Sequence, residues 1–342
     1  MRKNRKFTLL PALLCAAVLF FVPLVAGNRD RPASPASVSV PTVPAATATA
    51  TTTATAAQTS GETFTVLCAD GKTTGRIACR DFLIFTLAAE MLPSFEPEAL
   101  KAQAVASYTY FCYERDREKE SPQKALCGAD FADTPVPFPD GYTEAYWKKK
   151  WGDTAYAAAY PKLAAAVDAV AGVTVTYNGK PILAAYHAVS PGKTETAEAV
   201  WASALPYLRS VDSPADKNAP NYATTVRLTA KEFKAALKDV PGISLSGDAK
   251  TWVADDAVRS AAGTVLKQTV GTVALTGKEW RERFGLRSAC FSVTYQDGGF
   301  TFTVKGSGHG VGLSQYGAQF AALDGADYKE ILHRYYTNVK IE

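Results

Sequence analysis

The chain has 342 residues, of which 47% are apolar, so it holds enough apolar material for a sizeable globular core. Its formal net charge is +4, and the basic residues at positions 2, 3, 5 and 6 alone supply four positive charges, which leaves the rest of the chain close to neutral. No basic stripe interleaved with aromatic residues is present, and this argues against a nucleic-acid-binding protein.

Residues 1–6 form a basic tail, and residues 7–26 form an uncharged apolar run of 20 residues. A run of this length can cross a bilayer as a helix, and the basic residues before it favour a cytoplasmic N-terminus. A cleaved signal peptide has a shorter apolar core and a clearer cleavage site than Leu24-Val25-Ala26. We therefore expect a single-pass transmembrane signal anchor at the cell membrane, with the C-terminal domain extracytoplasmic.

Residues 27–61 are rich in Pro, Ala and Thr. Such a segment buries too little apolar surface to offset the entropy cost of ordering it, so we expect a disordered linker. Residues 62–342 are then the folded extracytoplasmic domain.

Five cysteines follow the apolar run, at positions 68, 79, 112, 127 and 290, and no Cys-x-x-Cys pair is present. Cys68 and Cys79 flank a short Gly-containing turn and are candidates for a disulfide in an oxidising compartment. Free buried thiols are an equally good interpretation of the same residues.

The stretch from residue 82 to residue 112 places one carboxylate between two apolar helices. An apolar run from Phe82 ends at Glu90, and Pro93 interrupts the helical pattern because proline lacks a backbone N–H. Pro97 suits the first position of a second helix. One face of that helix is predicted from apolar residues at steps of four, four and three: Leu100, Ala104, Tyr108 and Phe111.

Glu90 is the candidate for chemistry in this stretch. A carboxyl group at the edge of an apolar surface loses solvation, and the loss raises its pKa. A general acid that works near neutral pH needs such a raised pKa. The plain alternative is that Glu90 only ends a helix in water.

The segment from Lys162 to His187 is predicted from local pattern alone. An Ala-rich helix over 162–171 ends at Gly172, which suits a left-handed cap. Residues 173–177 alternate like a strand, Asn178-Gly179 supplies a hairpin turn, and residues 182–187 return as the second strand.

The hairpin leads into a polar turn. Gly192 permits a tight turn, and Ser190, Thr194 and Glu195 would present hydroxyl and carboxylate groups at one rim. A serine-type turn that caps the next helix explains the same residues equally well.

Two later segments repeat a strand–helix unit. Thr229 and Thr276 each end a strand and open a Thr-x-x-Glu capping box, which predicts helices over 230–237 and 277–284. A second hairpin is expected over 290–295 and 300–305. We assign these segments to the scaffold.

Residues 306–318 contain closely spaced glycines around His309. Glycine lets a backbone approach a ligand or adopt positive φ. Ser314 is placed to cap a helix that runs to about residue 323. The spacing fits neither a phosphate-binding loop nor a nucleophile elbow. A purely structural interpretation has the glycines packing and His309 buried in the core.

A last helix, 328–335, is opened by Asp327. Helices that alternate with antiparallel hairpins predict an α+β fold.

Three segments, in this order, resemble the signatures of the stage II sporulation protein D family: residues 90–106, 187–208 and 306–318. The third is the most specific, and the resemblance runs from about Thr63 to Ile341. The family contains lytic transglycosylases that act on the glycan strands of peptidoglycan, together with relatives described as amidase enhancers.

The resemblance implies a membrane-anchored lytic transglycosylase that remodels the septal wall during engulfment in sporulation. It would cleave the β-1,4 bond between N-acetylmuramic acid and N-acetylglucosamine and leave a 1,6-anhydro end. Glu90 matches the catalytic glutamate, acting as acid and then as base; Glu98, the other candidate, is already explained by its first-turn position. The residues implied to bind substrate are Lys101, Gln103, Tyr108, Ser190, Gly192, Thr194, Glu195, His309, Gly310, Ser314, Gln315 and Tyr316.

Tyr108 departs from the family pattern, because arginine is usual at this position and tyrosine supplies neither its charge nor its forked donors. This departure and the amidase-enhancer relatives leave one alternative function open, a non-catalytic peptidoglycan-binding scaffold that recruits or stimulates a cell-wall amidase.

Some relatives carry a Cys/His zinc cluster near the second helix. Cys112 and Cys127 lie in that region here without a histidine, so we expect no metal and no other cofactor. A metallohydrolase is the weakest candidate. The expected partners are glycan strands, a cell-wall amidase and a membrane protein of the engulfment machinery.

Overall fold

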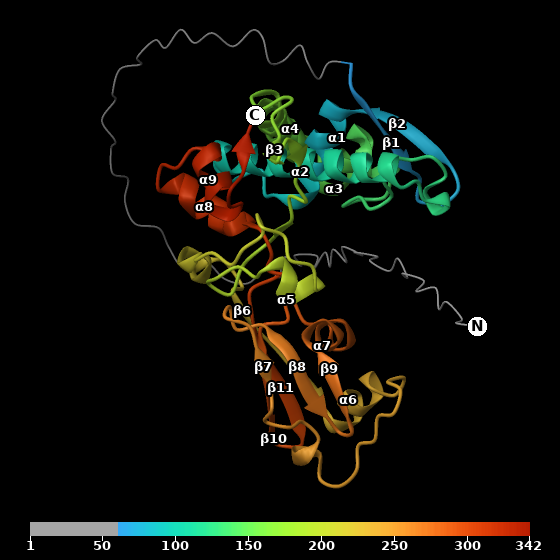
Figure 1. Cartoon of the computed structure of the whole chain (residues 1–342), viewed down its shortest axis with the longest axis vertical. Helices are drawn as coiled ribbons and strands as arrows, with labels where there is room; N and C mark the ends of the chain where they lie inside the picture. The colour runs from blue at the N-terminus through green and yellow to red at the C-terminus, as the bar shows by residue number, and fades with distance from the viewer. Residues whose placement is uncertain (1–60) are drawn as a thin grey trace, which may run out of the picture. The chain divides into compact units, whose positions relative to one another are not determined.

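The structure, a computed structural model, describes residues 61–342 (Figure 1). The basic tail, the expected anchor at 7–26 and the expected linker up to residue 60 lie outside the described residues. Within residues 61–342, no helix is both long and apolar enough to span a bilayer.

Helices and short strands alternate along the described chain. The α-helices are α1 (Cys79–Glu90), α2 (Pro97–Glu120), α3 (Glu144–Trp151), α4 (Asp153–Asp168), α5 (Ala197–Trp201), α6 (Ala230–Ala236), α7 (Gly277–Phe284), α8 (Gln315–Leu323) and α9 (Tyr328–Tyr335). The 3-10 helices are η1 (Lys124–Leu126), η2 (Asp140–Tyr142), η3 (Pro214–Asn218) and η4 (Ala249–Thr251). The strands are β1 (Thr63–Leu67), β2 (Thr74–Ala78), β3 (Val175–Tyr177), β4 (Lys180–Pro181), β5 (Tyr186–His187), β6 (Ala223–Thr229), β7 (Val258–Arg259), β8 (Val265–Val270), β9 (Val273–Thr276), β10 (Phe291–Gln296), β11 (Gly299–Lys305), β12 (Leu313–Ser314) and β13 (Lys340–Ile341).

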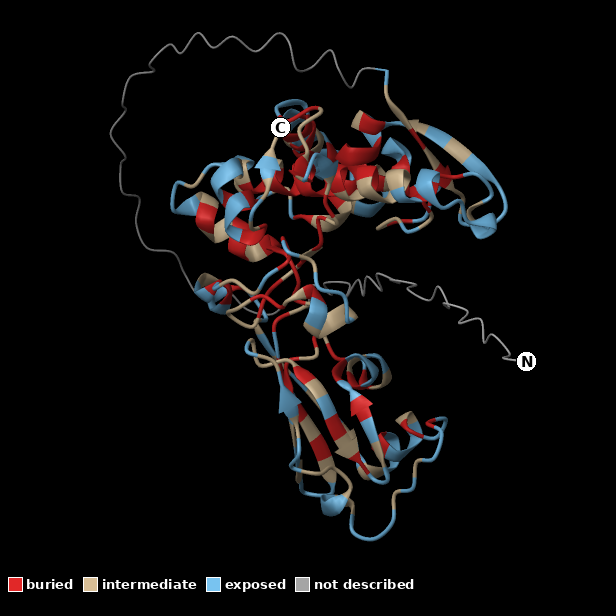
Figure 2. Cartoon of the chain, viewed as in Figure 1, coloured by how far each residue is buried: buried red, intermediate tan, exposed pale blue. Residues whose placement is uncertain are grey.

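A first hydrophobic core forms around α2, which packs against α1, α4, α8 and α9. The alanines of α2 are small enough to let these helices approach closely, and nearly every residue from Ala99 to Cys112 is buried. Buried residues run along both α1 and α2 in Figure 2. The ring of Phe82 on α1 packs edge to face against the ring of Phe111 on α2, with ring centroids 4.7 Å apart. This packing fixes the position where α1 ends, and therefore the position of Glu90.

A second hydrophobic core draws its members from residues 233–304. The sheets β10-β11-β6 and β7-β8-β9 and the helices α6 and α7 supply them. Phe233 stacks on Phe300 with ring centroids 3.8 Å apart, and Trp280 is fully buried. Within the described chain, antiparallel sheets mixed with helices confirm the predicted α+β class.

One two-stranded parallel sheet joins segments that are far apart in the sequence. β5 pairs with β12, with Tyr186 opposite Leu313 and His187 opposite Ser314. Gly312 makes the approach possible, because a Cβ at this position would lie 2.0 Å from the carbonyl oxygen of Ala185. The pair brings the second and third signature segments together.

Several local predictions are confirmed. Thr229, Thr276 and Asp327 each form a complete capping box with a glutamate three residues later. The expected hairpin over 290–305 is present as β10 and β11. These features depend on short-range hydrogen bonds, so local sequence was sufficient to predict them.

Two local predictions are wrong in part. The helix expected over 162–171 is part of α4, which begins earlier, at Asp153, continues through Pro161 and ends at Asp168. Its buried face, which includes Tyr156 and Leu163, packs on the first core and outweighs the hydrogen bond lost at proline. The return strand expected over 182–187 is also wrong, because pairing with β3 stops at Pro181 and β5 pairs with β12 instead.

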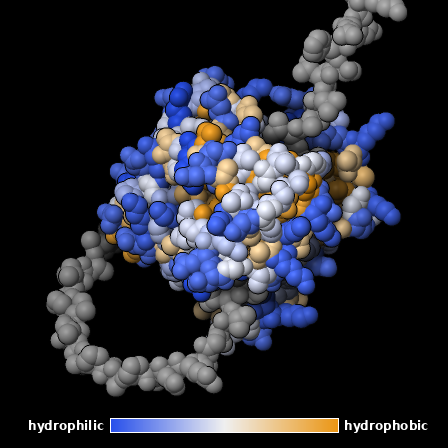
Figure 3. Space-filling model, turned by 90° about the horizontal axis from the view of Figure 1, so that it is seen from below, coloured by the Kyte–Doolittle hydropathy of each residue, from blue (hydrophilic) through white to orange (hydrophobic). Residues whose placement is uncertain are grey.

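The five described cysteines are free, so Cys68 and Cys79 form no disulfide. No group of three or more His, Cys, Asp or Glu side chains within residues 61–342 is arranged to hold a metal ion. Apolar side chains on the face seen in Figure 3 lie in small groups among more polar ones. Large apolar residues that are exposed in the described chain are Leu92, Val258 and Leu323. Scattered residues of this kind are ordinary on a protein surface.

Candidate active site

Glu90 is the last residue of α1. The helix ends there, because Met91 is extended and Pro93 follows two residues later. The residues from Phe82 to Ala88 are all buried, whereas Glu90 is only half-buried. The helix therefore carries its carboxyl group from the apolar core to the edge of solvent, as the sequence predicted.

Four neutral polar side chains form a network around Glu90. Nε2 of Gln315 donates to Oε2 of Glu90 at 3.3 Å and to Oε1 of Gln103 at 3.4 Å. Nε2 of Gln103 in turn lies 3.0 Å from Oγ of Ser107. The hydroxyl of Tyr186 hydrogen-bonds to Glu90 and also interacts with Ser107. The network thus closes on itself around the carboxyl group.

Each member of this network is positioned by a different element. Gln103 and Ser107 lie one turn apart on α2, so they face the same side. Gln315 is the first residue of α8, and Tyr186 lies on β5. The site therefore exists only because the first core brings α1, α2, β5 and α8 together.

The surroundings of Glu90 raise its pKa from 4.5 to about 7. Loss of solvation is the main cause, and the hydrogen bonds from Gln315 and Tyr186 oppose it by favouring the charged form. At neutral pH the group is populated in both protonation states. Such a carboxyl group can donate a proton in one step and accept one in the next.

His309 lies on the glycine-rich loop in contact with Trp201, with ring centroids 5.1 Å apart. Its Nδ1 accepts a hydrogen bond from the backbone N–H of Val311 at 3.1 Å, which leaves the proton on Nε2, where it reaches the backbone of Tyr186. Burial, followed by the charges of His187 and Arg281, lowers the pKa of His309 to about 3. His309 is therefore neutral, and it orients the strand that carries Tyr186.

The expected binding residues of the polar turn are engaged inside the protein. The backbone N–H of Ser190 donates to the carboxylate of Asp216 at 2.7 Å. Oγ1 of Thr194 accepts from the N–H of Val211 at 2.9 Å. Glu195 is only 2% exposed and accepts from the hydroxyl of Ser260 at 2.6 Å. The N–H of Gly192 also donates to Oγ of Ser190 at 3.2 Å, so the serine-type turn is present, but the next helix, α5, is capped by Thr196 and not by these residues.

Glycines of the same region serve close packing. Gly192 has φ of 109°, and a Cβ there would lie 3.0 Å from the side chain of Lys217. Gly310 has φ of 82°, and its Cβ would lie 3.1 Å from Cγ of Glu195. The positive φ disfavours a side chain at both positions, and the close approach of Gly310 to Glu195 shows that the glycine-rich loop lies against the polar turn.

Ser314 is fully buried and caps α8 as predicted, because its Oγ accepts from the N–H of Gly317 at 3.2 Å. Tyr316 is half-buried, and its ring packs edge to face against Phe95 with ring centroids 5.0 Å apart. Its partly exposed ring lies one residue after Gln315. An aromatic face in this position suits a sugar ring.

Two residues that were expected to bind substrate, Lys101 and Tyr108, bond to residues outside the Glu90 network. Lys101 forms an ion pair with Glu98 at 2.5 Å, and Glu98 also accepts from the backbone N–H of Tyr328 at 3.0 Å. Tyr108 donates to Glu62 at 2.5 Å, beside an ion pair between Glu62 and Arg115. The hydroxyl of Tyr108 is therefore bound to Glu62, the residue just before β1, and is not available to a ligand at Glu90.

Sequence reasoning missed Tyr186, Ser107 and Asp216. The Gln103–Ser107 spacing of four was available as a signal, because it places two polar residues on one face of an apolar helix. Tyr186 and Asp216 gave no such signal, since their roles depend on contacts between distant segments.

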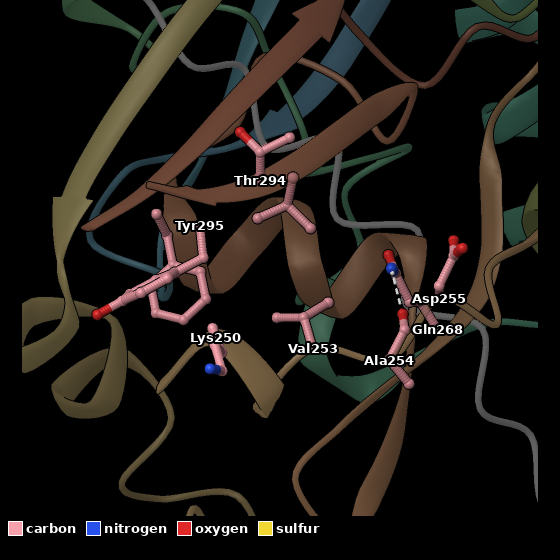
Figure 4. Close-up of a pocket in the computed structure, with 9 residues that line it drawn as sticks. Lys250, Val253, Ala254, Asp255, Gln268, Thr294 and Tyr295 are labelled. Carbon is pink, nitrogen blue, oxygen red and sulfur yellow. Dashed lines mark hydrogen bonds between the residues drawn. The ribbon is translucent and has the colours of Figure 1, made fainter. Parts of the chain in front are cut away.

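A separate depression of about 200 Å³ lies in the second core, between β8 and β10 (Figure 4). Nε2 of Gln268 donates to the carbonyl oxygen of Ala254 at 3.0 Å beside it. The residues that line this depression are Lys250, Val253, Ala254, Asp255, Gln268, Val293, Thr294, Tyr295 and Phe300. None of these belongs to a signature segment, so we place the candidate site at Glu90.

A half-buried carboxyl group of near-neutral pKa, held by neutral donors, defines a site suited to general acid–base chemistry. Comparison with known proteins then identifies the family. The family model described as stage II sporulation protein matches residues 69–177. The stage II sporulation protein D of Bacillus subtilis (strain 168) is 35% identical over 344 residues, which cover 98% of this chain and 96% of that protein.

The protein of the same name from Bacillus amyloliquefaciens is 38% identical over 265 residues, covering 78% of this chain and 74% of that protein. The chain therefore belongs to the stage II sporulation protein D family, which is involved in sporulation. An amidase enhancer of Bacillus subtilis (strain 168) is 27% identical over 299 residues, covering 72% of this chain and 38% of that protein.

Proposed function

We propose that the protein is a lytic transglycosylase that cleaves peptidoglycan glycan strands during sporulation. The observation that carries the proposal is the raised pKa of Glu90, at about 7, in a network of neutral donors. Membership of a family that is involved in sporulation supports the proposal.

The reaction needs one group that gives and then takes a proton. Protonated Glu90 donates its proton to the glycosidic oxygen, and the bond from C1 of N-acetylmuramic acid to that oxygen breaks. The carboxylate then removes the proton of the same sugar's 6-hydroxyl, whose oxygen bonds to C1. The product is a 1,6-anhydro ring, Glu90 ends protonated as it began, and no water is consumed.

A hydrolytic glycosidase would need a second carboxylate at a defined separation from the first. Two other buried carboxyl groups, Glu195 and Asp216, are poor candidates for this role. Glu195 is bound to Ser260, and Asp216 is fully buried and accepts hydrogen bonds from buried donors. A reaction with a single carboxylate therefore fits this site better.

The neighbouring groups suit a neutral polysaccharide. Trp201 and Tyr316 offer partly exposed aromatic faces on which sugar rings can stack. Gln103 and Gln315 are amides with both donors and acceptors for hydroxyl and acetamido groups. Such groups would orient the glycan so that its scissile oxygen meets Glu90.

The test is digestion of purified peptidoglycan by the full-length chain. Wild type, Glu90→Gln and the control Glu98→Gln are compared on intact wall and on strands stripped of stem peptides, with products identified by mass spectrometry. We expect 1,6-anhydro products from wild type and Glu98→Gln, and a loss of roughly 10²–10⁴-fold in rate with Glu90→Gln. Reducing-end products would contradict the single-carboxylate mechanism.

The similarity to an amidase enhancer supports one alternative, a non-catalytic scaffold that binds glycan and stimulates an amidase. The same experiment separates the two functions. A scaffold would bind strands without cleaving them, and Glu90→Gln would bind and stimulate as well as wild type.

We also propose that the apolar run at residues 7–26 anchors the protein in the cell membrane, with residues 62–342 outside the cytoplasm. Its partners would then be glycan strands, a cell-wall amidase and a membrane protein of the engulfment machinery. Fractionation and protease accessibility of the folded domain in intact cells test this placement.

A further inference from the structure

We propose that Asp216 is a positioning residue that holds the two hydrogen-bond donors of Glu90, Gln315 and Tyr186, in place. The inference rests on the proposed function, because it assigns Asp216 a role in the acid–base site. It is carried by the hydrogen bonds of one buried carboxylate.

Asp216 lies on η3 and is fully buried. Its Oδ2 accepts from the backbone N–H of Ser190 and from Oγ of Ser314, both at 2.7 Å. Its Oδ1 accepts from Oγ of Ser213 at 3.0 Å, and that hydroxyl lies 2.8 Å from the hydroxyl of Tyr335. Two of these three donors belong to signature segments.

The two donors to Oδ2 lie directly beside the strands that carry the Glu90 network. Ser190 follows β5, which contains Tyr186, and Ser314 is the last residue of β12. Gln315 comes immediately after Ser314 and starts α8. One carboxylate oxygen therefore ties together the strand that supplies Tyr186 and the helix that supplies Gln315.

The surroundings of Asp216 leave its side chain little freedom to move. A Cβ at Gly317 would lie 2.7 Å from Oδ1 of Asp216 and 2.0 Å from the hydroxyl of Tyr335. The first turn of α8 therefore packs directly on the carboxylate. A shift of Asp216 would move α8, and with it Gln315.

No lysine or arginine within residues 61–342 forms an ion pair with Asp216; its hydrogen-bond partners are neutral. Three hydrogen bonds to one buried side chain restrict its movement, so Asp216 is an effective anchor. The titratable groups that face it are His187, Tyr222 and Tyr335. Burial lowers the pKa of His187 to about 4, so this imidazole is neutral near pH 7.

The sign of the effect on Glu90 follows from this arrangement. Gln315 and Tyr186 lower the pKa of Glu90, while loss of solvation raises it. Loss of the anchor loosens both donors and leaves the carboxyl group in the same apolar surroundings. The pKa of Glu90 should then rise.

The experiment is a pH titration of the Glu90 carboxyl carbon by NMR in the full-length chain labelled with ¹³C-glutamate. The Glu90 signal is assigned by its absence from Glu90→Gln. We expect Asp216→Ala to raise the pKa of Glu90 by about one unit, and Ser314→Ala to raise it by about half as much. An asparagine oxygen can occupy the Oδ2 position, so Asp216→Asn should restore most of the wild-type value.

Ser213→Ala is the matched control. It removes a hydrogen bond from the same carboxylate, but on the Oδ1 side, and it leaves both donors to Oδ2, from Ser190 and Ser314, in place. Ser213→Ala should lower the melting temperature while the pKa of Glu90 stays at its wild-type value. A residue with only a structural role would move stability in all variants and the pKa in none.

The proposal is overturned if folded Asp216→Ala leaves the pKa of Glu90 unchanged or lowers it. If Asp216→Ala does not fold, Ser314→Ala against Ser213→Ala decides, and equal pKa values in those two variants overturn the proposal. The titration needs no catalytic turnover. A failure of the proposed activity would therefore be seen separately, as the absence of anhydro products.

Discussion

Replacement of Glu90 by glutamine should stabilise the protein, and only at the pH values where the carboxyl group must ionise. The pKa of Glu90 rises from 4.5 to about 7 on folding. Between these values the native state holds a proton that the unfolded chain has released, so wild-type stability falls as pH rises through this window. Glutamine resembles the protonated carboxyl group and does not titrate, so the variant avoids this loss.

The magnitude follows from the two pKa values. Each pH unit in the window costs about 1.4 kcal/mol, and partial exposure of the carboxyl group to solvent reduces the total. We therefore expect Glu90→Gln to be more stable than wild type by about 2–3 kcal/mol at pH 8 and nearly equal to it at pH 4.

Urea denaturation of both proteins at pH 4, 6 and 8 measures the difference. Glu98→Gln is the control, because Glu98 accepts hydrogen bonds from Lys101 and from the backbone of Tyr328, and its loss should destabilise the protein at pH 8. A stability difference between Glu90→Gln and wild type that is the same at pH 4 and pH 8 would refute the reasoning.

Gln315→Met should raise the pKa of Glu90 by about one unit, because it removes a hydrogen bond to the charged form; an unchanged pH–activity profile would contradict this. Gly317→Ala should lower stability by more than about 2 kcal/mol, since its Cβ would lie 2.0 Å from the hydroxyl of Tyr335, and thermal melting measures the loss. Phe233→Ala should cost about 3–5 kcal/mol in urea denaturation by opening the second core, while the pKa of Glu90 stays constant in the NMR titration.

The parts of the fold that sequence could predict are those governed by neighbouring residues. The Thr229 and Thr276 capping boxes, the Ser314 cap and the hairpin at 290–305 need only contacts between residues close in the chain. The predicted start of the helix after Pro161 was wrong for the opposite reason. α4 continues through this proline because the packing of one helix face on the core, and not local propensity, determines where the helix begins.

The candidate site was also predicted only in part, for the same reason. Glu90 was found because an apolar run ends at it, which is a local property. Tyr186 was missed because the hairpin pattern assigned its segment to a different strand partner. Glu195 looked like a rim residue in the sequence, but Ser260 from a segment 65 residues away covers it.

The hydrogen bond from Gln315 to Glu90 spans 225 residues of sequence. That bond lowers the pKa of Glu90, and the raised value comes from burial in the folded domain, so in an unfolded chain Glu90 is an ordinary acid that is ionised at neutral pH. A chain that has not folded would therefore carry Glu90 without its proton at neutral pH. The raised pKa of Glu90 is therefore reached only in the folded domain, and the acid–base activity that we propose would be withheld from any chain that has not finished folding.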